Sequence, residues 1–162
     1  MSQSKPYSIG LRNVGSFQVS GQPWVTGSNN LDDQKVHLVE FPYVCKSFTV
    51  INKNEQGSDI RVHFASGSAT AVTVPGDTGA QTSATTDDVQ QFHYITVYGN
   101  ADQQTGSFAA YGPSVMTFDC KCSKFYISNH SGNDNLAYEV FAQLTNIPTA
   151  RMYNLTGSGI TE

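Results

Sequence analysis

Short runs in which apolar and polar residues alternate recur along most of this chain, and they constrain its fold more than any other feature. In one run, Ile60, Val62 and Phe64 alternate with Arg61 and His63. A period of two places successive side chains on opposite faces of a pleated strand. Strand-like runs are predicted at residues 35–41, 44–52, 59–65, 69–74, 91–98, 114–120, 122–128 and 136–145.

Turn-forming residues separate these runs. Segments 52–57 and 130–135 are rich in Asn and Gly, which favour tight turns and positive φ angles. Short strands at a spacing of about 8–12 residues, without a helical period between them, are typical of an antiparallel sandwich or barrel. The sequence therefore predicts an all-β fold: a single antiparallel β-sandwich, jelly-roll-like, with about eight to ten strands.

Length and charge limit the functions that this chain can have. Its 162 residues suffice for one domain with its own core. Only 14% of the residues are charged, the net charge is −4, and Lys and Arg are scattered singly. Binding to a phosphate backbone needs a basic stripe, so we expect no direct nucleic-acid partner. No run approaches the ~20 apolar residues of a membrane helix, so we expect no membrane span.

Composition divides the chain into three segments. Residues 31–148 contain the alternating runs and are predicted to form the β-sandwich domain. Residues 1–30, rich in Gly, Ser, Asn and Gln, are predicted to be an N-terminal arm or edge strand, and residues 149–162 a C-terminal tail. Two long polar loops are predicted, at 75–89 and 99–113.

Several large apolar side chains fall outside the alternating core, in the arm, the second long loop and the tail. Exposed aromatic side chains in such segments can anchor protein interfaces, although the loop could equally fold back on the sandwich. The candidate partner-contact residues are Phe17, Trp24, Phe108, Tyr111, Met152, Tyr153 and Leu155.

The chain has three cysteines, at Cys45, Cys120 and Cys122. An odd number is a poor disulfide framework, and residues 1–10 lack the apolar segment of a secretory leader, so we expect free thiols in a reducing cytosol. Cys120 and Cys122 are two residues apart, so on a strand they would project from one face, and we expect buried free thiols that act as small hydrophobes. Further ligands at metal-binding spacing are missing, so no metal site is predicted.

No catalytic signature accompanies the strand pattern. The alternation places His63 opposite the face of Ile60 and Val62, toward solvent, and His93 in a partly buried position. A nucleophile elbow of the GxSxG type is absent. Asp134 could serve a calcium site, but a turn-forming cluster of Asn and Asp is the simpler interpretation. We therefore expect no enzymatic activity and no cofactor.

Two stretches of the chain resemble a known class of virion proteins. Residues 36–64 read VHLVEFPYVCKSFTVINKNEQGSDIRVHF, and residues 125–162 begin FYISN and end VFAQLTNIPTARMYNLTGSGITE. Together they cover roughly two-fifths of the sequence. They resemble small β-sandwich capsid decoration (cement) proteins or minor capsid proteins of tailed phages and other DNA viruses.

The resemblance implies a structural protein of the virion, placed on the capsid and assembled in the host cytoplasm. It implies a homo-oligomer, with a trimer favoured, that binds the major capsid protein and bridges neighbouring capsomers. Repetition over a symmetric shell strengthens each weak contact. Decoration, vertex and spike roles remain open.

A carbohydrate- or receptor-binding head domain is the alternative function. Exposed Trp and Tyr side chains in a β-sandwich can stack on sugars as well as on proteins. In this alternative, Trp24 and the aromatic residues of the loops would carry the binding site.

Overall fold

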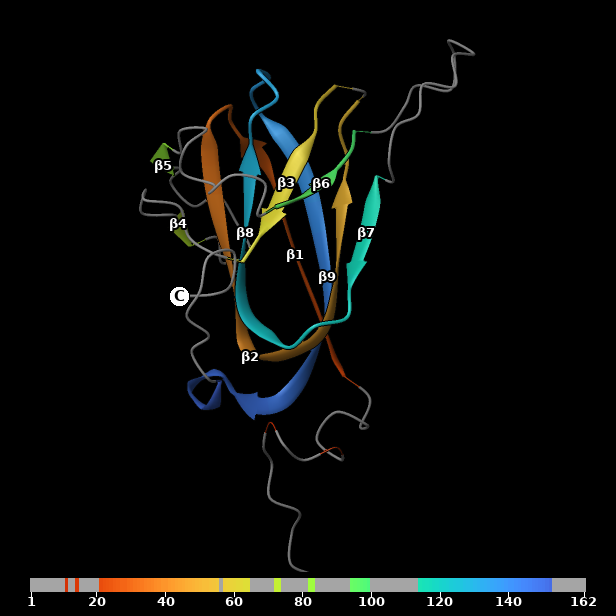
Figure 1. The fold of residues 1–162 in the computed structure, drawn as a ribbon, viewed down its shortest axis with the longest axis vertical. Helices are drawn as coiled ribbons and strands as arrows, with labels where there is room; N and C mark the ends of the chain where they lie inside the picture. The colour runs from red at the N-terminus through yellow and green to blue at the C-terminus, as the bar shows by residue number, and fades with distance from the viewer. Residues whose placement is uncertain are drawn as a thin grey trace, which may run out of the picture.

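The computed structural model describes residues 11, 14, 21–55, 57–64, 72–73, 82–83, 94–99 and 114–152. Seven strands longer than two residues form antiparallel ladders in one connected sheet (Figure 1). They are β1 (Gln22–Leu31), β2 (Lys35–Asn52), β3 (Ile60–His63), β6 (Ile95–Val97), β7 (Val115–Phe118), β8 (Cys122–Asn129) and β9 (Leu136–Pro148).

The remaining elements are short. The two-residue strands β4 (Val72–Thr73) and β5 (Thr82–Ser83) both pair with β2, β4 in the parallel sense. Among the described residues, the only helical turn is the 3-10 turn η1 (Thr149–Arg151). The prediction of an all-β, antiparallel fold is confirmed.

β2 connects two parts of the sheet: the first contains β8, β3 and β6, and the second contains β9, β1 and β7. Its first part pairs with β8, from Val36↔Ser128 to Glu40↔Lys124, and its second part pairs with β9 on one side and β7 on the other. Around Cys45 the register shifts in the pairing with both β8 and β9. β2 turns back on itself in this region (Figure 1).

Pro42 does not divide this strand. The sequence predicts two separate strands here, at 35–41 and 44–52. That division is wrong, since β2 is continuous from Lys35 to Asn52. Pro42 is exposed and lies where the pairing with β8 is irregular, so its missing N–H interrupts no regular ladder.

β7 and β8 follow β2 through its bend. β7 runs antiparallel to the second part of β2, with Phe48 opposite Phe118, and β8 runs antiparallel to the first part. Residues 119–121 join β7 to β8. This short connection therefore lies beside the bend of β2, where Cys45 pairs with Cys122.

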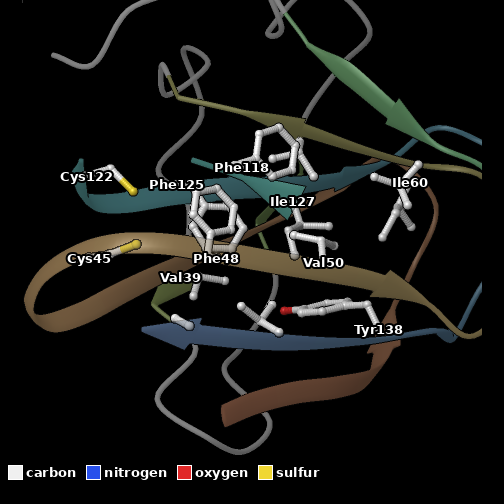
Figure 2. Close-up of a cluster of buried hydrophobic side chains, with 14 of the residues drawn as sticks. Val39, Cys45, Phe48, Val50, Ile60, Phe118, Cys122, Phe125, Ile127 and Tyr138 are labelled. Atoms are coloured by element: carbon white, nitrogen blue, oxygen red, sulfur yellow. The ribbon is translucent and has the colours of Figure 1, made fainter. Parts of the chain in front are cut away.

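The core gathers side chains from both parts of the sheet and is centred on Phe48 (Figure 2). The Phe48 ring stacks on Phe118, with 4.8 Å between centroids, and on Phe125, with 4.3 Å. Phe41 packs against both Phe48 and Phe125. Aromatic contacts therefore join β7, β8 and both parts of β2.

Three turns at one end of the sheet are tied together by hydrogen bonds. The Asp33 N–H donates to Asp134 Oδ1 at 2.9 Å, and the Gly132 N–H donates to Asp33 Oδ1 at 3.0 Å. Asn133 Nδ2 donates to Ser58 Oγ at 3.1 Å. Gly132 has a φ of 81°, a left-handed conformation that glycine adopts without steric cost. The turn predicted at residues 130–135 is confirmed.

The predicted arm and tail lie only partly within the described residues. Residues 22–30 of the arm belong to β1, which pairs with β9 as an integral strand of the sheet. η1 begins the predicted tail, while residues 153–162 and most of the two predicted long loops lie outside the described residues. The predicted segment boundaries stay predictions.

Replacing Phe48 with Ala removes the ring at the centre of the core. We expect the free energy of unfolding to fall by about 3–5 kcal/mol, because this side chain is 1% exposed and stacks on two rings. Urea denaturation followed by circular dichroism measures the change. Phe141→Ala is the matched control, since Phe141 is 40% exposed and should lose less than about 1 kcal/mol. Equal losses in the two variants would contradict the central place of Phe48.

Candidate interaction surface

The structure describes two of the predicted contact residues, Trp24 on β1 and Met152 after η1. Trp24 is half-buried: its ring meets Phe41 edge-on, with centroids 5.1 Å apart, and packs against the core. Five predicted contact residues lie outside the described part of the chain and stay predictions: Phe17, Phe108, Tyr111, Tyr153 and Leu155.

Met152 lies close to the bend of β2. Its N–H donates to the Thr149 carbonyl oxygen at 2.8 Å, which closes η1, and its side chain is half-buried. Pro148, just before η1, pairs with Tyr43 of β2. The first residues of the predicted tail are therefore held beside the bend.

One face of β1, β9, β2 and β7 carries apolar side chains toward solvent, and we call it the open face. Its first row consists of Val25, Phe141, Thr49 and Thr117, which are register partners on neighbouring strands. Val25 is 69% exposed and Phe141 is 40% exposed. The hydroxyl oxygens of Thr49 and Thr117 lie 2.9 Å apart in a mutual hydrogen bond. This row therefore presents apolar and hydroxyl groups without a charge.

A second row of the open face crosses the same strands at Gly27, Glu139, Ile51 and Val115. Val115 is 46% exposed. Glu139 carries the only charge of the two rows, and its Oε1 lies 3.0 Å from Lys53 Nζ. The open face thus contains a neutralised charge among apolar and small polar side chains. Depletion of charge is typical of the centre of a protein interface.

β1 forms an edge of the sheet next to the open face. It pairs with β9, and no other strand of the described segments pairs with it. Its ten residues include no charged side chain, and Pro23 alone lacks an N–H. An uncharged edge strand is a template for pairing with another chain. The open face and this edge together form the candidate interaction surface.

Val25, Phe141 and Val115 are not among the contact residues predicted from the sequence. A signal for Phe141 was present, since the period of two places it with Glu139 on the face opposite Val140. A large apolar residue on the polar face of a strand marks an exposed contact position. Whether such a residue belongs to a larger apolar surface depends on the strands beside it, which the alternation within one strand does not reveal.

The carboxylates of Asp32 and Asp134, in the turns at one end of the sheet, accept hydrogen bonds from backbone N–H groups. Asp32 Oδ1 accepts from the Asn135 N–H at 3.2 Å, and Asp134 Oδ1 accepts from the Asp33 N–H. Within the described residues, no group of three His, Cys, Asp or Glu side chains is placed to hold a metal ion. These bonds favour the interpretation of Asp134 as a turn-forming residue.

His37 and Tyr138 form a hydrogen-bonded pair inside the protein. His37 Nδ1 lies 2.9 Å from the Tyr138 hydroxyl oxygen, and both side chains are buried. Burial lowers the pKa of His37 to about 4, although the charge of Asp32 opposes this shift. Burial also raises the pKa of Tyr138. Both groups are therefore neutral at pH 7.

The prediction that His63 faces solvent is wrong. This residue is 1% exposed, and its ring stacks on Tyr126 with 5.4 Å between centroids. The same face of the sheet carries a small apolar cluster of Val36, Leu38 and Tyr126. Alternation separates the two faces of a strand, but here both faces are buried. His93, the other predicted strand histidine of interest, lies outside the described residues.

No family model matches this chain, and no curated protein or solved structure matches it significantly. The resemblance to capsid decoration proteins therefore rests on the two sequence stretches alone. Among the described residues, no helix is long and apolar enough to cross a membrane.

We expect acid to destabilise the protein through His37. Its pKa of about 4 lies below the ordinary value of 6.5, so the unfolded state takes up a proton first as the pH falls. The stability that the neutral ring contributes is complete above pH 6.5 and is lost between pH 6.5 and about 4. The loss amounts to about 1.4 kcal/mol per pH unit, or about 3 kcal/mol in total. Urea denaturation across this pH range measures it.

Two variants separate His37 from the other titrating groups. His37→Leu should flatten the pH dependence in this range, because it removes the group that the unfolded state protonates. Tyr138→Phe should keep the dependence, since burial is the largest cause of the lowered pKa of His37. An unchanged slope in His37→Leu would remove His37 from the explanation.

Proposed function

We propose that this protein is a non-enzymatic structural component of a virus particle, which decorates or cements the capsid shell. It self-associates, with a homotrimer favoured, and binds the major capsid protein. The observation that carries the proposal is the open face, where Val25, Phe141 and Val115 expose apolar surface. The sequence resemblance to decoration and minor capsid proteins points in the same direction.

The electrostatics of the open face suit contact between protein chains. Copies of a chain with a net charge of −4 repel one another at long range. An unpaired charge buried in an interface would add a desolvation cost. On the open face, the charge of Glu139 is already paired with that of Lys53. The two rows therefore contain no unpaired charge. Weak contacts of this kind become effective when a symmetric shell repeats them.

We also infer that the two parts of the sheet form the layers of a jelly-roll-like β-sandwich. In support, β2 and the β7–β8 segment turn together. One core cluster combines Val39 and Phe125 from the first part with Phe48 and Val140 from the second. A sandwich of this kind would leave the open face on the outside of one layer. Location in the virion, after assembly in the host cytoplasm, follows from the proposed role.

The alternative of a carbohydrate- or receptor-binding head depends on Trp24. Stacking on a sugar needs an accessible ring face. The Trp24 ring is engaged by Phe41 and packs against the core. We therefore favour the role on the capsid.

The mass of the protein in solution tests self-association. By light scattering we expect a closed oligomer, and Val25→Lys and Phe141→Lys should shift it toward the monomer, because each places an unpaired charge in the apolar row. The stability of each variant should stay within about 1 kcal/mol, since both side chains are exposed. Ile95→Lys is the matched control: Ile95 is 42% exposed but lies on β6, away from the open face, and this variant should keep the oligomer.

The same variants test binding to the shell. Wild-type protein and Ile95→Lys should co-sediment with shells of the cognate major capsid protein, and the two open-face variants should stay in the supernatant. A wild-type monomer that ignores shells would rule out the proposed role. A glycan screen would then test the alternative function.

Deletion of residues 149–162 tests the predicted tail. The sheet should stay folded by circular dichroism, because η1 contains no buried residue. Shell binding should weaken by about tenfold or more, the effect of losing one well-packed contact. Unchanged shell binding of the truncated protein would assign the contact to the open face alone.

A further inference from the structure

Three thiols meet where β2 bends. Cys45 on β2 pairs in register with Cys122 at the start of β8, and their sulfur atoms point toward each other (Figure 2). Cys120 lies two residues before Cys122, in the connection between β7 and β8. The Cys45 thiol donates to the Cys120 carbonyl oxygen, with 3.9 Å between sulfur and oxygen. We call these three residues the thiol cluster.

The members of the thiol cluster differ in access and acidity. Cys45 and Cys122 are buried, whereas Cys120 is only partly buried. A hydrogen bond with Cys122 lowers the pKa of Cys120, although burial and the charge of Asp119 oppose this shift. Hydrogen bonds with Cys120 and Cys45, together with burial, raise the pKa of Cys122. Cys120 is therefore the accessible thiol, and it becomes a thiolate, the nucleophilic form, more readily than Cys122 does.

We propose that the thiol cluster is an oxidation site for small disulfides, in which Cys120 reacts first and a Cys45–Cys122 disulfide is the product. The Cys120 thiolate attacks one sulfur of a small disulfide such as oxidised glutathione. This step forms a mixed disulfide and releases one glutathione thiolate. The mixed disulfide removes the Cys120 thiolate, whose hydrogen bond is the largest cause of the raised pKa of Cys122. Cys122 then loses its proton to the released glutathione thiolate and attacks the Cys120 sulfur. This step forms a Cys120–Cys122 disulfide and releases the second glutathione.

In the last step Cys45 attacks the Cys122 sulfur and releases Cys120 as a thiolate. The protons of Cys45 and Cys122 pass to the two released glutathione thiolates, through solvent. In total, two protein thiols are oxidised to one disulfide, and one external disulfide is reduced to two thiols. Cys120 ends as it began.

Geometry and leaving-group chemistry both favour this product. Register partners in an antiparallel pair have Cα atoms about 4.5–5.5 Å apart, within the ~4.4–6.8 Å that disulfides span. A thiol with a low pKa is the better leaving group, which favours the release of Cys120. A Cys120–Cys122 disulfide closes only a very small ring, whereas Cys45–Cys122 ties β2 to β8 and encloses β3 to β7. Longer closed loops restrict the unfolded chain more.

This inference does not rest on the proposed role at the capsid. It concerns the isolated chain, so shell binding can fail while oxidation occurs, and the reverse. Its consequence is a protein that folds with free thiols under reducing conditions and gains a covalent clamp at the β2 bend under oxidising ones.

The test uses the full-length reduced protein and oxidised glutathione. After incubation, free thiols are alkylated and disulfides are mapped by mass spectrometry. We expect one internal Cys45–Cys122 disulfide with Cys120 alkylated, and reversal by dithiothreitol. The oxidised protein should unfold at a higher urea concentration than the reduced protein. A folded protein whose thiols stay unreacted, or a final disulfide between other residues, would overturn the proposal.

Three variants resolve the order of steps. Cys120→Ala should slow oxidation by about tenfold or more, because both remaining thiols are buried. Cys122→Ala should stop at a glutathione adduct on Cys120, and Cys45→Ala should stop at the Cys120–Cys122 disulfide. A Cys120→Ala protein that oxidises as fast as the wild type would overturn the relay. Brief alkylation of the reduced wild type, which should label Cys120 first, tests the order without any substitution.

Discussion

The turn of β2 at its irregular pairing brings together the parts of this protein that lie far apart in sequence. Val39 pairs with Phe125 in the first part of β2, and Phe48 pairs with Phe118 in the second. The stacking of Phe48 on Phe125, at 4.3 Å, joins these two pairs. That contact exists because the strand turns back between them. The β7–β8 segment has to follow the same turn, since it pairs with both parts.

The alternating pattern predicts where strands lie and which side chains share a face. It does not predict whether two runs join into one strand or whether a face is buried, because both depend on the neighbouring strands. β8 and β9 lie close to the predicted runs 122–128 and 136–145. The runs 35–41 and 44–52 were expected to be separate strands, but they form the single strand β2. The N–H that Pro42 lacks is not needed there, because the register with β8 is irregular. His63 was expected in solvent, but its face of the sheet carries a second small cluster with Tyr126. The sequence of one strand shows which side chains share a face, but it does not show which residues cover that face.

The same limit applies to the interaction surface. Phe48 and Phe141 are identical side chains on paired strands, yet one is 1% exposed and the other 40%. Alternation assigns them to opposite faces, but the open face becomes recognisable only because Val25 lies in the same row as Phe141 and Val115 in the next. Trp24, in contrast, stands out in the sequence as a lone tryptophan in a polar arm. Its ring packs on Phe41, because residues 22–31 form a strand of the sheet.

The bend also explains why cysteines that are far apart in sequence become neighbours. Cys45 and Cys122 pair at the bend, and Cys120 lies in the connection between β7 and β8 beside it. Both the aromatic core and the arrangement of β7, β8 and β9 depend on the path of β2 through the bend. A covalent bond at this position would therefore hold the strand with which β7, β8 and β9 all pair.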